Sequence, residues 1–167
     1  MAKILWGKPS ITITSVNPSS GTGTSANLTV PTPVADSTTL TTETGDKHTA
    51  DIEGGGYEAV RYDKNSFILS FAVRFAEGRT MPFEDVSADG TVEGTYKVEL
   101  TSDETGAPSM AMNEATVRYE DEFSADDGAR RVYYFESIMP ASGNQITWTH
   151  TAAQSTPAAE EGDSNPQ

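Results

Sequence analysis

Apolar and polar side chains alternate along several stretches of this chain, and this period of two constrains the fold more than any other feature of the sequence. Successive side chains of an extended strand point to opposite faces, so each such stretch predicts a strand with one buried face. The clearest stretch runs from Ser66 to Ala76. No window carries a helical stripe of a dozen residues. The sequence therefore predicts a mainly β fold, an antiparallel β-sandwich or barrel, with at most one short helical turn in the turn-rich segment 79–90.

The predicted core consists of the apolar faces of these strands. Its members are Phe67, Leu69, Phe71, Val73, Phe75, Tyr96, Val98, Leu100, Val117 and Tyr119. Burial of each side chain would contribute about 1.5 to 3 kcal/mol relative to exposure, which is enough to hold a small sandwich together. Further strands are predicted over residues 95–101, around 117–123, over 131–139 and over 145–149, so the region from Asn113 to His150 reads as two strands flanking an acidic turn, followed by a third.

Two turns are predicted in the first half of the chain. The strand from Tyr57 to Tyr62 is followed by the polar run Asp63-Lys64-Asn65, which predicts a hairpin with the strand that begins at Ser66. The threonine-rich segment 38–53 is either a solvated hairpin with a turn at Gly45-Asp46 or a long loop. Gly54, Gly55 and Gly56 then allow positive φ angles or a close backbone approach.

Composition divides the chain into three parts. Residues 1–37 hold a short strand around Ile11 and Ile13 and then an extended arm rich in Ser, Thr, Gly and Pro. Residues 38–151 form the predicted β-sandwich domain, and residues 152–167 form a small, polar tail that we expect to be mobile. The chain has no cysteine and therefore no disulfide. We also expect no secretory or membrane-spanning segment, because the first ten residues carry too few apolar side chains.

Negative charge is concentrated in the body of the chain. The formal net charge is −14. The only charged residues among 1–35 are Lys3 and Lys8, whereas residues 36–151 contain 22 acidic and 9 basic residues. Proteins that bind nucleic acid neutralise phosphates with Lys and Arg, so this body is expected to repel DNA. Alternatively, the acidity only keeps the domain soluble.

The sequence predicts no catalytic, cofactor-binding or metal site. His48 and His150 are the only histidines, and neither has an adjacent partner of catalytic type. The acidic pairs Asp103-Glu104 and Asp126-Asp127 lie in loops of the kind that calcium prefers, but their spacing matches no EF-hand, and a solvated turn explains them. The glycine triplet at 54–56 is not a phosphate loop, because no GK[ST] follows it.

Aromatic side chains leave one alternative function open. Trp6, Trp148, Tyr133 and Tyr134 are a possible sugar-binding platform in a monomeric β-sandwich binding module. Packing in a core or an interface is the commoner role of such residues.

The order of several motifs resembles the major tail tube protein of long-tailed bacteriophages, of the siphophage type. A polar loop precedes Gly54 to Gly56, a turn follows at 63–65, and then come DGTVEGTYKVELTSDE at 89–104, ADDGARRVYYFES at 125–137 and PASGNQITW at 140–148. The resemblance spans Leu40 to Trp148. It implies a non-enzymatic β-sandwich that closes into hexameric rings, which stack into a tube through which the genome passes. Such subunits usually include a helix packed on the sandwich, and none is evident in this sequence.

The resemblance also implies partners and contact residues. The partners would be further copies of the chain, the tape measure, tail terminator and distal tail proteins, and DNA in transit without tight binding. The location would be the virion tail, after synthesis in the host cytoplasm, with no membrane association and no cofactor. The arm and the loop before the glycine triplet would reach neighbouring rings. Candidate inter-ring contacts are Ile11, Ile13, Leu28, Val30, Leu40 and His48.

One strand face is a candidate for the wall of the channel. Glu120 and Glu122 share a face with Arg118, opposite the inward-facing Val117 and Tyr119. Carboxylates on a channel wall would keep DNA from adhering during passage.

Overall fold

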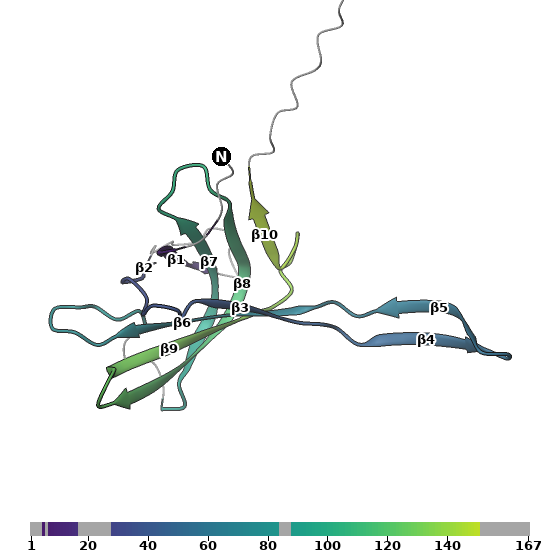
Figure 1. The fold of residues 1–167 in the computed structure, drawn as a ribbon, viewed down its shortest axis with the longest axis horizontal. Coiled ribbons are helices and arrows are strands. Elements are labelled where there is room, and N and C mark those ends of the chain that lie inside the picture. Colours follow the sequence, from purple (N-terminus) through teal and green to yellow (C-terminus); the bar gives the residue numbers. More distant parts are fainter. Residues whose placement is uncertain (1–4, 6, 17–27, 84–87, 151–167) are drawn as a thin grey trace, which may run out of the picture.

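A computed structural model describes residues 5, 7–16, 28–83 and 88–150, which form ten strands. The strands are β1 (Pro9–Val16), β2 (Leu28–Thr29), β3 (Thr39–Glu43), β4 (Lys47–Ile52), β5 (Gly56–Tyr62), β6 (Ser66–Arg74), β7 (Thr91–Ser102), β8 (Ser109–Ser124), β9 (Gly128–Ser137) and β10 (Ile146–Thr149). Every strand pairing is antiparallel, and no helix occurs in the described part of the chain (Figure 1). The predicted mainly β, antiparallel fold is confirmed.

One bent sheet supplies both layers of the sandwich. Its strand order is β2-β1-β7-β8-β9-β6-β3, and β10 pairs with β8. The long strand β8 belongs to both layers, because residues 109–112 pair with β10 whereas residues 115–124 pair with β9. The register between β7 and β8 shifts on both sides of Tyr96, and such irregularities bend and twist a sheet. The apolar faces of the two halves therefore enclose one core.

The core contains most of the predicted residues. Leu69, Phe71, Val73, Val98 and Val117 are buried, and Phe67, Tyr96, Leu100 and Tyr119 are half-buried against them. Stacked and tilted rings of Phe71, Tyr133 and Phe135 fill the centre. Alternation predicted this core well because the inward side chains recur at every second residue of β6, from Phe67 to Val73.

Phe75 was predicted to be in the core, and this prediction is wrong. Its side chain is 43% exposed. Strand β6 ends at Arg74, so Phe75 lies beyond the regular ladder, where alternation no longer fixes the direction of a side chain. Its ring contacts the guanidinium of Arg131 instead, at 5.4 Å from the ring centroid.

The described residues 75–83 of the segment between β6 and β7 close one side of the core. Met81 is buried, and the ring of Phe83 packs edge-on against Tyr96 at 4.8 Å between centroids. The buried hydroxyl of Tyr133 donates a 2.6 Å hydrogen bond to the carbonyl of Pro82. The helical turn expected in 79–90 does not occur at the described residues, and residues 84–87 lie outside them.

The chain between Thr39 and Arg74 forms one long ribbon with its turn at the glycine triplet. β3 pairs with β6, and β4 pairs with β5, in a register that stays in step across the unpaired residues 44–46 and 63–65. The predicted hairpin through Asp63-Lys64-Asn65 is therefore wrong. β5 and β6 do not pair with each other; they follow one another along the same long edge of the ribbon. The half made of β3 and β6 belongs to the sandwich, and the half made of β4 and β5 projects away from it (Figure 1).

The N-terminal part of the chain contributes directly to the sheet. β1 is confirmed as a strand and pairs with β7 along its whole length, from Pro9 to Val16. The arm at residues 17–27 and the tail from residue 152 lie outside the described residues.

Candidate interaction surfaces

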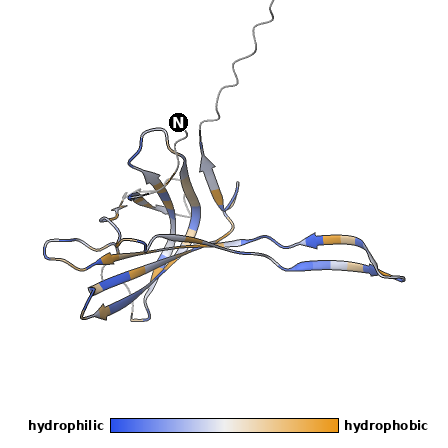
Figure 2. Ribbon diagram, in the orientation of Figure 1, coloured by the Kyte–Doolittle hydropathy of each residue, from blue (hydrophilic) through white to orange (hydrophobic). Residues whose placement is uncertain are grey.

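The projecting hairpin, β4 and β5, presents large side chains that no other element of the described residues covers; Lys47 of the same hairpin lies over the Tyr57 ring, with its Nζ 5.0 Å from the ring centroid. Every residue of both strands is exposed, including Tyr57 at 59% and Tyr62 at 66%. The register places Tyr57, Val60 and Tyr62 on one side of the ribbon, which we call the aromatic face. Figure 2 shows hydrophobic residues on β5 well beyond the sandwich. An isolated two-stranded ribbon is marginally stable in water, so these side chains point to a partner surface.

The tip of the hairpin is narrow because it consists of glycine. Gly54 and Gly55 have φ angles of 97° and 85°, a region that other L residues rarely adopt. A Cβ atom at either position would meet nothing within 4 Å. Backbone conformation, and not crowding, therefore requires these two glycines.

A polar cluster forms the neck between the sandwich and the hairpin. Asp63 accepts hydrogen bonds from Arg61 at 3.0 Å and pairs with Nε2 of His48 at 2.8 Å. The hydrogen bonds from His48 and then Arg61 lower the pKa of Asp63. A backbone hydrogen bond of 2.9 Å from Asp63 to the carbonyl of Asp46 crosses the unpaired stretch. A Cβ atom on Gly45 would overlap the Asp63 carbonyl, so the two strands cross closely at this point.

Three of the predicted inter-ring residues are unavailable to another subunit. Ile11, Ile13 and Val30 are buried in the core of their own chain, so their prediction as inter-ring contacts is wrong. The resemblance implied that the N-terminal segment reaches neighbouring rings, but β1 is enclosed between β2 and β7 of its own chain. Leu28 is exposed and Leu40 is half-buried against the core. His48 lies in the neck, with 57% of its side chain exposed.

The outer face of β8, β9 and β6 holds Glu120 and Glu122, as alternation predicted, but it also holds arginines. Arg118 donates to Glu120 at 3.0 Å, and Arg130 donates to Glu122 at 2.8 Å. At one end of this face Arg74 pairs with Asp127 at 2.9 Å. The carboxylates are therefore largely neutralised within the subunit. The sequence placed Arg118 on this face, but it did not predict the pair of Arg130 with Glu122, because cross-strand partners depend on the register of β8 with β9.

Strand alternation places Asp121 on the same face of β8 as Tyr119, at the rim of the core, where it pairs with Arg131 and its side chain is 51% exposed. The carboxylate accepts two hydrogen bonds from this guanidinium, at 2.5 and 2.8 Å, and the Arg131 side chain is only 8% exposed. The guanidinium also stacks on Tyr119 at 4.1 Å from the ring centroid. The hydrogen bonds from Arg131 lower the pKa of Asp121. This pair fastens β8 to β9 at the rim of the core.

The aromatic residues of the alternative binding platform do not gather on one surface. Tyr133 is fully buried, whereas Trp148 is 52% exposed on β10. Tyr134 lies on the opposite face of β9 from Tyr133, where Arg118 stacks on its ring at 4.9 Å. Trp6 lies outside the described residues.

Among the described residues, no three His, Asp or Glu side chains converge in a way that could hold a metal ion. In the same part of the chain, no helix is long and apolar enough to cross a membrane. His150 is exposed at the end of β10.

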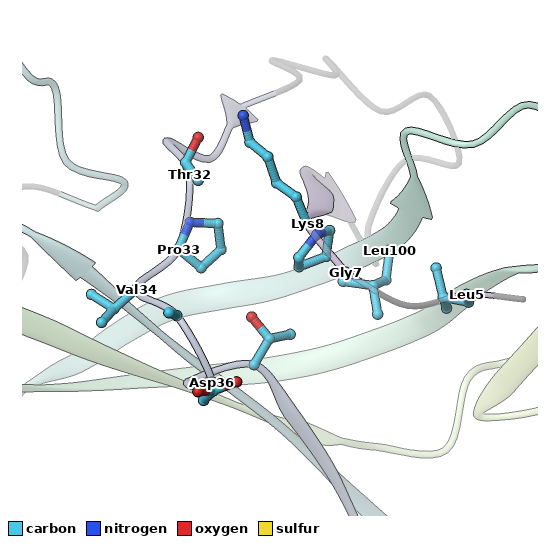
Figure 3. A pocket seen from close by; sticks show the side chains of 11 residues that line it. Leu5, Gly7, Lys8, Thr32, Pro33, Val34, Asp36 and Leu100 are labelled. Atoms are coloured by element: carbon cyan, nitrogen blue, oxygen red, sulfur yellow. The ribbon is translucent and has the colours of Figure 1, made fainter.

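A hollow of about 600 Å³ opens between the start of β1, the segment 32–38 and the end of β7 (Figure 3). Its lining is mostly apolar and includes Leu5, Pro9, Pro33, Val34 and Leu100. Lys8 and Asp36 add one charge of each sign, toward opposite ends of the hollow in Figure 3.

No protein-family model matches this sequence, and no curated protein is significantly similar to it.

Proposed function

We propose that this chain is the subunit of a phage-type tail tube, which assembles into hexameric rings that stack around a channel for the genome. The observation that carries the proposal is the hairpin formed by β4 and β5. It is an extension of the sandwich with no core of its own, and it exposes Tyr57, Val60 and Tyr62 to solvent. An element of this kind costs stability in a monomer and becomes useful when a second subunit covers it.

In this proposal the sandwich forms the ring and the hairpin spans the gap to the next ring. The shared register of the ribbon supports this role, because it continues from β3 and β6 into β4 and β5 across only three residues of each side that lie outside the strands. The partners of the subunit would be copies of the same chain and the tail proteins that cap the tube. The assembly would be located in the virion tail. The motif order from Leu40 to Trp148 supports the same assignment.

The outer face of β8, β9 and β6 is the proposed channel side. Glu120 and Glu122 lie there, and their ion pairs with arginines make the face mixed in charge. A surface whose cations are all engaged by carboxylates offers little to a phosphate backbone, which suits passage without adhesion.

Sedimentation velocity of the whole chain across a range of concentrations tests the proposal. We expect wild-type protein to associate, and we expect the double variant Tyr57→Ser, Tyr62→Ser to associate at least about tenfold more weakly, because buried tyrosines dominate interface energies. Ala59→Ser is the control, since Ala59 is exposed on the other side of the same hairpin. A wild-type chain that stays at 17.8 kDa at every concentration would contradict the proposal.

A further inference from the structure

The hollow beside β1 and the tip of the hairpin have complementary chemistry, and in a single chain they do not meet. The hollow is an apolar cavity of about 600 Å³, a size typical of sites that enclose a ligand or a few side chains. The hairpin of the same chain leads away from the sandwich, so its tip does not fill this cavity (Figure 1). Within the described residues, neither of these two surfaces therefore covers the other.

The tip carries the apolar groups that such a cavity accepts. Ile52 is 50% exposed and Tyr57 is 59% exposed, on either side of the glycine turn. The turn itself has no side chains at Gly54 and Gly55, so its backbone can approach another surface closely. A narrow tip flanked by an aliphatic and an aromatic side chain fits a cavity lined by Leu5, Pro33 and Leu100.

The hollow carries one cation, Lys8, that is opposite in charge to the acids of the tip, and one acid, Asp36. Within the described residues, Lys8 has no carboxylate partner, and Glu53 and Glu58 at the tip have no cationic one. Opposite charges at facing surfaces fix the register of docking. Asp36, the acid that lines the hollow, is exposed. Its carboxylate can accept a hydrogen bond from a tyrosine hydroxyl, and Tyr57 at the tip offers one.

We propose that the hairpin tip of one copy docks into the hollow beside β1 of a second copy, with Ile52 and Tyr57 inserted and Glu53 facing Lys8. This inference rests on the proposed self-assembly and names the surface that receives the hairpin. Each copy then offers one tip and one hollow, so the contact is head to tail and propagates from copy to copy.

Site-specific disulfide crosslinking tests the contact, since the natural chain has no cysteine. Two single variants of the full chain, Ile52→Cys at the tip and Thr32→Cys at the rim of the hollow, are mixed under association conditions and mildly oxidised. We expect mass spectrometry to find a disulfide between positions 52 and 32 in at least about tenfold excess over the control. The control mixture pairs Ile52→Cys with Ala125→Cys, which is exposed in the turn between β8 and β9.

Charge exchange gives an independent readout in the same assembly. Lys8→Glu and Glu53→Lys should each weaken association by about two- to fivefold, the usual range for an exposed ion pair, and the double variant should restore it. If the chain assembles but gives neither the 52–32 disulfide nor the rescue, the docking site is wrong while self-assembly stands. If no assembly forms at all, the proposed function fails and this inference fails with it.

Discussion

At the scale of single residues, the pair between Asp121 and Arg131 shows how a charge can lie on the core side of a strand. Alternation places Asp121 on the inward face of β8 at the rim of the core, where the mostly buried guanidinium of Arg131 would be costly without a carboxylate partner. The register of β8 with β9 sets Arg131 directly opposite, and two hydrogen bonds satisfy the carboxylate. The sequence predicted the face correctly, but it contains no signal for a partner ten residues away across a turn.

We expect Asp121→Asn to destabilise the fold by about 2 to 3 kcal/mol, because Arg131 would keep a mostly buried charge without a counterion. Because the pKa of Asp121 is lowered in the fold, its stabilising effect is present above the ordinary aspartate pKa and is lost as the pH falls through the lowered value. The stability difference between the two proteins should therefore shrink below about pH 4. Urea unfolding at a series of pH values measures both effects.

Glu122→Gln is the matched control for this substitution. Its ion pair with Arg130 is exposed, so its removal should cost less than about 1 kcal/mol. Equal losses for the two variants would show that the Asp121 pair has no special role.

At the scale of elements, the long ribbon shows where sequence reasoning stops. The strands were predictable because β-branched and aromatic residues alternate in them. Their pairing was not, because Asp63-Lys64-Asn65 has the composition of a turn although it lies in the middle of one side of the ribbon. Turn-forming residues are found both in hairpin turns and in irregular stretches that interrupt the hydrogen bonding between two strands. Only the pairing register of the flanking strands distinguishes a turn from such an interruption.

Gly45 is the residue of the neck that tolerates substitution least. We expect Gly45→Ala to destabilise the protein by about 1 to 3 kcal/mol, because the added Cβ overlaps the carbonyl of Asp63 and one strand must move. Hydrogen exchange should show faster exchange of the amides of β4 and β5, with those of β7 and β8 less affected. Gly56→Ala serves as the control, since its Cβ would make ordinary 3.7 Å contacts with Ile52. The neck account is wrong if both variants behave like the wild type.

At the scale of the whole molecule, the distribution of charge bears on how DNA would meet the proposed tube. The net charge is −14, yet the proposed channel face is mixed because arginines from β6, β8 and β9 engage its carboxylates. The charge census from the sequence found the acidic excess but not its local neutralisation, which depends on which strands become neighbours.

Charge reversal of this face should create affinity for DNA. In Glu120→Lys, Glu122→Lys, the new lysines would join Arg118, which loses its pair with Glu120, and Arg130, which keeps only its 3.6 Å pair with Asp127. We expect fluorescence anisotropy to detect duplex DNA binding that weakens steeply with salt, whereas the wild-type chain shows none at physiological salt. As a control, Glu77→Lys, Glu104→Lys adds the same charge at exposed positions in loops. If both variants bind DNA equally, the effect follows net charge and not this face.

Self-assembly is the central claim, and negative-stain electron microscopy of the purified full chain tests it most directly. The account predicts sixfold rings with a central channel, and stacks of these rings at higher protein concentration. Uniform single-chain particles at every concentration would contradict it.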